Sequence, residues 1–493
     1  MSSKSKLPEV MYNEWKVSVL DRVKSLVSKS SKYNFNNILS HKHVKDELEA
    51  LHDKYVMVPT DKAANNVTFV CKKLYLTLIT NEINSATFQS VTQSENDLIS
   101  THKCFLDKFG MALEDENSKL PILYITPKQH KSPIGFRFIT SGYNCSLQQL
   151  SKQLSICLKS MLHSAKNYSK YHNKFHNRND FYIIDDHTPV INFIAANNPQ
   201  SGRKSISTFD FSTLYTSIPH QQLKDNLCKF VNKVFEFKNK TFIIPNSFNK
   251  KAYFSNSKSN KNVAFSKEDL IECLTFLIDN SYVNINGVIY RQIIGIPMGT
   301  NSAPQIANIY LHVYEFLYIS NLVELGDDES LEKLSNIFRY QDDLISFNDL
   351  GLLENILQDI YPREMIVNKT NISPCKCNYL DMTISIYRGK FVVKLFDKRK
   401  DYQFNVISYP FLDGNVPLDR SHGIFMSQLI RICNVNTELN QFLEDIRILS
   451  RKLCRQGFNP AALRKILLKF YHSKIDFWGK FGVDLYENLM QCI

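Results

Sequence analysis

Three aspartates are the residues of this sequence best suited to catalysis. Asp342 and Asp343 are adjacent between apolar and aromatic residues, and Asp210 has a similar setting upstream. Mg²⁺ prefers oxygen ligands and needs few carboxylates, because it also keeps water and phosphate oxygens. Two divalent ions about 3.5–4 Å apart stabilise the attacking and leaving oxygens of phosphoryl transfer. We therefore expect the three aspartates to hold two Mg²⁺ ions, or Mn²⁺ in their place.

The acidic pair also has a plainer interpretation. Residues 338–347 have the pattern of a β-hairpin with Asp342 and Asp343 at its tight turn. Turns favour aspartate because its side chain bonds its own backbone, so this pattern alone favours a simple turn. The metal interpretation requires Asp210, at the end of a predicted strand, to lie beside the hairpin in one antiparallel sheet.

A basic hairpin is predicted upstream, where two alternating segments within residues 121–140 flank a Ser-Pro-Ile-Gly turn. It carries Lys128, Lys131 and Arg137. Such cations on a β-ribbon could grip a triphosphate or a template backbone. The alternative is an ordinary exposed hairpin rich in lysine.

Two further features stand at informative spacings. Tyr215 follows Asp210 by five residues, where a bulky ring could exclude a ribose 2′-hydroxyl; the alternative is a core aromatic. Gln292, Gly295 and Gly299 precede a long helix predicted from about residue 303 to 322. Glycines at a helix entry allow close backbone approach to a ligand.

Composition limits the classes of partner. The chain has 493 residues, 43% of them hydrophobic, and a net charge of +12. Such a balance suits a polyanion, nucleic acid before membrane, and much of the excess lies in a predicted C-terminal helical region, residues 386–493. Eleven irregularly spaced cysteines favour reduced thiols in an intracellular protein. We find neither a secretory signal nor an apolar run of membrane-spanning length.

Taken in order, these motifs resemble those of reverse transcriptases, and the resemblance extends from about residue 58 to 481. It is closest to Penelope-like retroelements, a family related to telomerase catalytic subunits. The segments that carry it are Asp61-Lys62, Pro127-Lys128-x-His130-Lys131, residues 209–219 (FDFSTLYTSIP), residues 295–301 (GIPMGTN), Phe338-Arg339-Tyr340-x-Asp342-Asp343 and Leu380-Asp381.

The resemblance implies an α+β right-hand polymerase fold with fingers, an antiparallel-sheet palm and a helical thumb. The expected regions are a helical N-terminal extension (1–57), fingers (58–204), a palm (205–385) with a surface insertion near 236–265, and a basic thumb (386–493). The implied activity is RNA-directed DNA synthesis, with an RNA template, a DNA primer and dNTPs as partners and the nucleus as the expected location.

The resemblance also implies roles for individual residues. Lys128 and Arg137 would lie near the triphosphate, Tyr215 would be the sugar gate, and Lys369 a weak candidate for the proton donor to pyrophosphate. The remaining candidates are expected to contact nucleotide, template or duplex: Lys131, Gln292, Gly295, Gly299, Lys398, Arg431, Arg451 and Arg455.

Two departures from the family pattern stand out. Gln341 replaces the aliphatic residue more usual before the acidic pair, which should not abolish activity. Many members carry a GIY-YIG endonuclease domain after the thumb, and we expect none in this sequence. Two alternatives stay open at this stage: an RNA-dependent RNA polymerase, which Tyr215 argues against, and a catalytically inactive nucleic-acid-binding relic.

Overall fold

The structure is a computed structural model. It describes residues 9–30, 41–113, 117–172, 178–200, 202, 204–258, 262–412, 416, 421–473 and 485–493. Among these residues, no helix is long and apolar enough to cross a membrane. None of the cysteines in these ranges forms a disulfide.

A four-stranded antiparallel sheet holds the residues of interest. Its strand order is β12 (Ile337–Tyr340), β13 (Asp343–Phe347), β6 (Ile206–Phe211) and β14 (Val367–Lys369). The hairpin β12–β13 is therefore confirmed, although its turn consists of Gln341 and Asp342, and Asp343 is the first residue of β13. Its place beside the strand that ends near Asp210 is also confirmed. The pairing sets Asp343 directly opposite Asp210.

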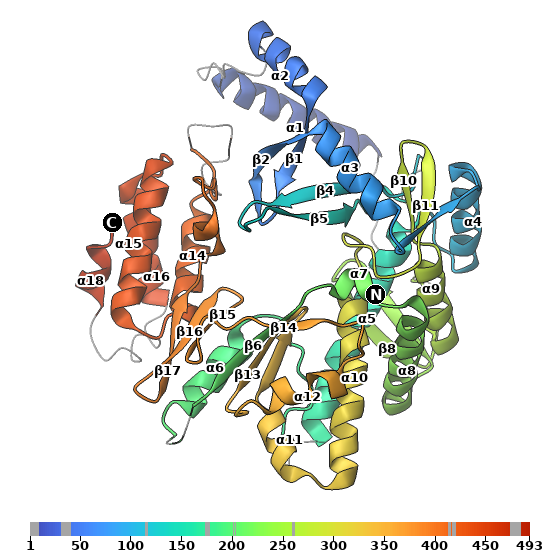
Figure 1. The fold of residues 1–493 in the computed structure, drawn as a ribbon. Coiled ribbons are helices and arrows are strands. Elements are labelled where there is room, and N and C mark those ends of the chain that lie inside the picture. The colour runs from blue at the N-terminus through green and yellow to red at the C-terminus, as the bar shows by residue number, and fades with distance from the viewer. Residues whose placement is uncertain are drawn as a thin grey trace.

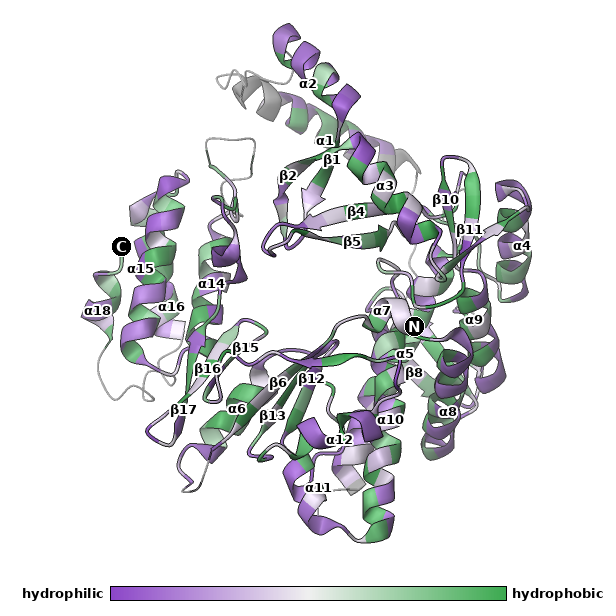
Figure 2. Cartoon of the chain, in the orientation of Figure 1, coloured by the Kyte–Doolittle hydropathy of each residue, from purple (hydrophilic) through white to green (hydrophobic). Residues whose placement is uncertain are grey.

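The two faces of this sheet are covered differently. Phe209 and Leu344 point into the largest apolar core. Helices fill that core: α5 (Gln148–His172), α8 (His220–Lys238), α9 (Lys267–Asp279), α10 (Ala303–Leu325), α11 (Asp328–Leu334) and α12 (Leu352–Ile360). Figure 2 shows α10 as one of the strongly apolar helices, which agrees with its burial.

The opposite face carries Ile206, Ile345 and Phe347, which form a smaller core. That core also contains α6 (Thr188–Asn197) and the sheet of β15 (Lys376–Tyr379), β16 (Met382–Tyr387) and β17 (Lys390–Leu395). Because side chains alternate along a strand, Asp210 and Asp343 lie on this second face. They stand at the end of the strands, beyond the apolar cover.

The N-terminal region differs from its prediction. After α1 (Glu9–Ser30) and α2 (Lys42–Lys54), the chain forms a hairpin of β1 (Tyr55–Thr60) and β2 (Ala63–Cys71). The sequence predicts a helical extension up to residue 57, whereas the structure has strand from Tyr55 onward. Asp61 and Lys62 form the tight turn, with Lys62 at φ 58°.

Two other predicted hairpins follow the sequence more closely. The basic hairpin is confirmed as β4 (Leu123–Lys128) and β5 (Gly135–Thr140). The Asn286-Gly287 turn joins β10 (Tyr282–Ile285) to β11 (Val288–Gln292), and β11 also pairs with β3 (Phe88–Val91). Helix α3 (Lys72–Ile83) precedes β3 in the sequence, and α4 (Glu95–Lys108) lies between β3 and β4.

The described part of the predicted surface insertion, residues 236–258 and 262–265, is partly buried. It contains β7 (Phe242–Asn246), β8 (Lys251–Ser255) and β9 (Phe265–Ser266), which form one sheet. Ile243 and Phe265 are buried in the largest core. The apolar residues that face this core are separated by polar turns, so the segment shows no sustained period.

The C-terminal helices have their own apolar core, which includes Phe425, Phe442 and Phe470. They are α14 (Gly423–Val435), α15 (Leu439–Arg455), α16 (Pro460–Ser473) and α18 (Tyr486–Met490). The predicted boundary at 385/386 falls inside strand β16, so the sheet β15–β17 bridges the two predicted regions.

The segment before these helices contacts the N-terminal hairpin (Figure 1). The Asn66 side chain donates to the carbonyl of Ile407 at 3.3 Å and accepts from its amide at 3.0 Å. The Tyr402 hydroxyl donates to the carbonyl of Asp61. Residues 402–407 therefore join β1–β2 to the C-terminal part of the chain.

Candidate active site

Asp210, Asp342 and Asp343 lie together as predicted. Each offers a carboxylate oxygen, these oxygens all lie within 4.8 Å of one another, and each side chain is partly exposed. The amide of Phe211 donates to the carbonyl of Asp342 at 3.2 Å, which ties the end of β6 to the turn. Hard oxygen donors at this spacing fit the ligand preference of Mg²⁺.

The electrostatics of the three carboxylates favour a bound cation. Burial, followed by the charges of Asp342 and Asp210, raises the pKa of Asp343 to about 6. Burial and the charge of Asp342 also raise the pKa of Asp210. Two like charges at short range disfavour ionisation of both, so a divalent ion would relieve a repulsion that the fold creates.

This repulsion predicts a pH-dependent effect of metal on stability. Because the pKa of Asp343 is raised, its contribution to folding is present below its unfolded pKa and lost as pH rises through about 6. We expect Mg²⁺ to raise the Tm at pH 8, where the carboxylates are ionised, and to have little effect at pH 5. Thermal unfolding with Mg²⁺ or EDTA checks this.

Asp343→Asn is the matched variant for that measurement. It removes the titrating group at nearly constant volume, so the Mg²⁺-dependent rise in Tm at pH 8 should shrink. An equal Mg²⁺-dependent rise in Tm at pH 5 and pH 8 in the unaltered protein would contradict the assignment of Asp343 to a metal site.

Basic residues gather near the aspartates. The positive charges of three lysines lower the pKa of Asp210 and so oppose its rise: Lys131, Lys398 and Lys62. These lysines are therefore close enough to interact with its carboxylate. Lys62 is exposed along part of its side chain, yet desolvation of its ammonium and the charge of Lys398 lower its pKa to about 8. Two lysines so close together would favour a bound polyanion.

The two predicted triphosphate contacts have different surroundings. Burial lowers the pKa of Lys128, and the charges of Arg137 and Lys131 lower it further. The charge of Asp210 raises it. Arg137 forms an ion pair with the buried Asp61 at 2.7 Å. The turn of β1–β2 thus holds Arg137 in place near the aspartates.

Tyr215 lies against the turn that carries Asp342. It belongs to α7 (Leu214–Ser217), is partly buried, and donates its hydroxyl to the Gln341 amide oxygen at 3.2 Å. Because Gln341 directly precedes Asp342, this bond connects the predicted sugar gate to the turn that carries Asp342. The sequence showed Gln341 only as a departure from the family pattern and gave no sign of this bond.

The glycine loop packs against both neighbouring segments. A Cβ at Gly295 would lie 2.4 Å from the carbonyl oxygen of Tyr215, and one at Gly299 would lie 2.2 Å from that of Thr140. Both glycines have positive φ values. Gln292 is buried, and its side-chain amide donates to the Ile294 carbonyl at 2.9 Å, so it supports the loop from inside instead of facing a nucleotide.

Two predicted site residues have other partners. Lys369 lies opposite Phe209, on the face of the sheet away from the aspartates, and pairs with Glu354 of α12. This position does not support its assignment as a proton donor. Arg431 pairs with Asp381 at 2.8 Å, and His187 contacts the same carboxylate at 3.1 Å. Arg431 thus joins α14 to the turn between β15 and β16, which does not support contact with a duplex.

The four other predicted nucleic-acid contacts are exposed cations. Arg451 and Arg455 are exposed on α15, and Lys131 and Lys398 are exposed near the aspartates.

Asn368, which the sequence did not indicate, lies opposite Asp210 in β14, on the aspartate face. Its amide donates to the Ser212 hydroxyl. The strand register would have identified it, but register cannot be derived from so short a strand.

No protein-family model matches the sequence, and no curated protein does. Among solved structures, telomerase from Candida albicans in complex with a fragment of telomeric RNA has a TM-score of 0.60 at 12% identity. The alignment covers 90% of this chain and 71% of that one. This likeness shows the fold: a right-hand polymerase with fingers, an antiparallel-sheet palm and a helical thumb.

Two further solved structures are less similar. Telomerase from Candida tropicalis, again with a fragment of telomeric RNA, has a TM-score of 0.49 at 14% identity and covers 90% of this chain and 68% of that one. The BmCPV RNA-dependent RNA polymerase at its elongation state has a TM-score of 0.39 at 11% identity and covers 76% and 32%. At these scores, neither adds to the argument on fold or function.

Proposed function

We propose that this chain is an RNA-directed DNA polymerase that extends a primer 3′-hydroxyl with dNTPs on an RNA template. The observation that carries the proposal is the meeting of Asp210, Asp342 and Asp343 at one end of the palm sheet. The right-hand fold agrees with a polymerase. Membership of the Penelope-like retroelements is part of the proposal and rests on the motifs alone.

Each group near the aspartates has a role in this reaction. When bound, two divalent ions would stabilise charge on the attacking and leaving oxygens. Asp210 and Asp342 would hold them, and Asp343 would support the site. Lys128, Arg137 and Lys62 would bind the triphosphate by charge-assisted hydrogen bonds.

The proposed domain boundaries are the predicted ones, fingers from 58, palm from 205 and thumb from 386.

The decisive experiment is primer extension by the full chain. A DNA primer annealed to RNA or to DNA is incubated with dNTPs or with rNTPs, in Mg²⁺, Mn²⁺ or EDTA. We expect metal-dependent DNA synthesis on the RNA template. Synthesis only with rNTPs would favour an RNA polymerase, and no synthesis on either template would favour an inactive nucleic-acid-binding protein.

The sugar gate gives a separate prediction. Tyr215→Ala should raise rNTP use relative to dNTP use, by about 10-fold or more, because removal of the ring opens space for a 2′-hydroxyl. Steady-state kcat/KM for a matched dNTP and rNTP measures this ratio.

Tyr215→Phe is the matched control, because it keeps the ring and removes only the bond to Gln341. It should keep the preference for dNTPs. An unchanged ratio in Tyr215→Ala would show that Tyr215 is not the gate.

A further inference from the structure

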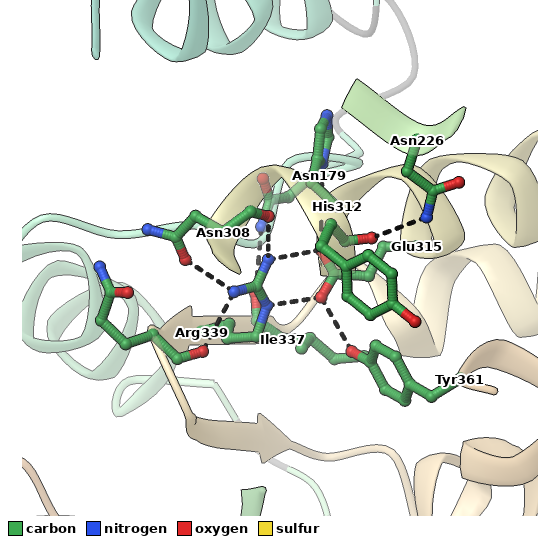
Figure 3. Close-up of polar contacts among 10 residues, drawn as sticks. Asn179, Asn226, Asn308, His312, Glu315, Ile337, Arg339 and Tyr361 are labelled. Atoms are coloured by element: carbon green, nitrogen blue, oxygen red, sulfur yellow. Dashed lines mark hydrogen bonds and ion pairs between the residues drawn. The ribbon is translucent and has the colours of Figure 1, made fainter. Parts of the chain in front are cut away.

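Arg339 is a fully buried cation directly behind the catalytic turn. Its side chain has 0% exposure and lies on the face of the sheet that points away from Asp343. Figure 3 shows its guanidinium between Asn308 and Glu315 of α10. Arg339 belongs to β12, the strand that leads directly into the turn that carries Asp342.

All five N–H donors of this guanidinium have acceptors. Nε and Nη2 donate to the two Glu315 carboxylate oxygens at 2.6 and 3.1 Å. Asn308 accepts twice, through its side-chain oxygen at 2.8 Å and its carbonyl at 3.2 Å. The fifth donor bonds the carbonyl of Gln341 at 3.1 Å. An arginine has five such donors, so its position is fully determined.

The fifth bond is the one that reaches the site. Gln341 has φ 55°, in the left-handed region that is costly for a residue with a side chain. Its carbonyl belongs to the peptide group that leads into Asp342. A backbone held in this conformation needs fixed partners, and Arg339 supplies one from the opposite side of the sheet.

The surroundings fix Arg339 in turn. Tyr361 donates its hydroxyl to Glu315 at 2.8 Å, so the carboxylate is held from a third element. The Arg339 backbone also bonds the neighbouring segment, with its amide donating to the Tyr182 carbonyl at 2.7 Å. These contacts leave the guanidinium little freedom to move.

Stability alone does not account for this ion pair. Burying two charges is costly, and well-packed apolar residues of similar volume are often as stable or more so. An apolar pair could fill the same space between β12 and α10, but it could not bond the Gln341 carbonyl.

We propose that Arg339 is a positioning residue that sets the location of the Asp342 carboxylate, and hence metal affinity and the rate of the chemical step. The proposal rests on the proposed polymerase function for its kinetic consequence. Its effect on metal binding does not depend on that function.

The test uses two variants. Arg339→Lys keeps the charge near Glu315 but has one nitrogen, which cannot reach Glu315, Asn308 and Gln341 together. Arg339→Met combined with Glu315→Met removes the buried pair at similar volume and should lower the Tm less than Arg339→Met alone, because it leaves no buried charge unpaired. Both should weaken Mn²⁺ binding, measured by electron paramagnetic resonance without nucleotide, about 10-fold. Both should also lower kcat about 100-fold, with KM for dNTP changed less than 3-fold.

Leu227→Ala is the matched control. It removes a buried side chain of α8 in the same core and should lower the Tm without changing Mn²⁺ affinity. Wild-type Mn²⁺ affinity and kcat in a folded Arg339 variant would overturn the proposal. If the double variant does not fold, Arg339→Lys decides. If the unaltered chain shows no synthesis, the proposed function fails, and the Mn²⁺ measurement still tests Arg339.

Discussion

Replacing Asp342 with asparagine should lower the rate of nucleotide addition by at least about 1,000-fold. Metal-based charge stabilisation contributes several kcal/mol, and each 1.36 kcal/mol corresponds to a factor of ten in rate. Asparagine keeps the size of the side chain and removes one charge from three mutually repelling carboxylates. We therefore expect the Tm to stay close to that of the unaltered protein, with template affinity retained. Primer extension and RNA binding measure the two effects.

Asp225→Asn is the matched control, because it makes the same change at an exposed position on α8. It should leave synthesis unchanged. Synthesis at the unaltered rate by a clean Asp342→Asn preparation would remove Asp342 from the metal site. Loss of RNA binding together with synthesis would instead indicate a folding defect.

Gly299→Ala should destabilise the fold and abolish most activity. The new Cβ would lie 2.2 Å from the Thr140 carbonyl oxygen, and φ is +120° there. The Thr140 amide also donates to the Met298 carbonyl at 2.7 Å, so the two segments cannot separate without losing that bond. Overpacking and backbone strain together should lower the free energy of unfolding by about 2–4 kcal/mol.

Gly326→Ala separates the effect of backbone strain from the effect of a steric clash. Gly326 also has a positive φ, +69°, but a Cβ there would meet nothing within 4 Å. That variant should lose only about 1–2 kcal/mol and keep its activity. Chemical denaturation and primer extension of both variants provide the comparison, and equal losses would show that Gly299 is required for its backbone conformation alone.

The sequence predicted the catalytic sheet well because its signals are local. Alternating residues and an acidic turn indicate the β12–β13 hairpin, and the need to bring carboxylates together places β6 beside it. Lys369 shows the limit of such signals. It follows Asn368 by one residue, and that single step moves it to the opposite face of the sheet.

Partners distant in sequence could not be predicted. Nothing in the pattern around Arg339 indicates Glu315, and nothing around Arg431 indicates Asp381. The hairpin β1–β2 was missed for a related reason. Its strands follow a helix directly, and its turn residues Asp61 and Lys62 resemble those of an exposed loop until Arg137 is seen to pair with Asp61.

The bonds between Asn66 and Ile407 close the polypeptide into a ring. The proposed fingers, palm and thumb are joined covalently in that order, and these bonds connect the last region back to the first on the aspartate side. A nucleic acid held there would be encircled. A strand with a free end can thread through such a ring, whereas a circular molecule can enter only if these bonds break. Encirclement would also oppose sideways escape, so many nucleotides could be added in one binding event.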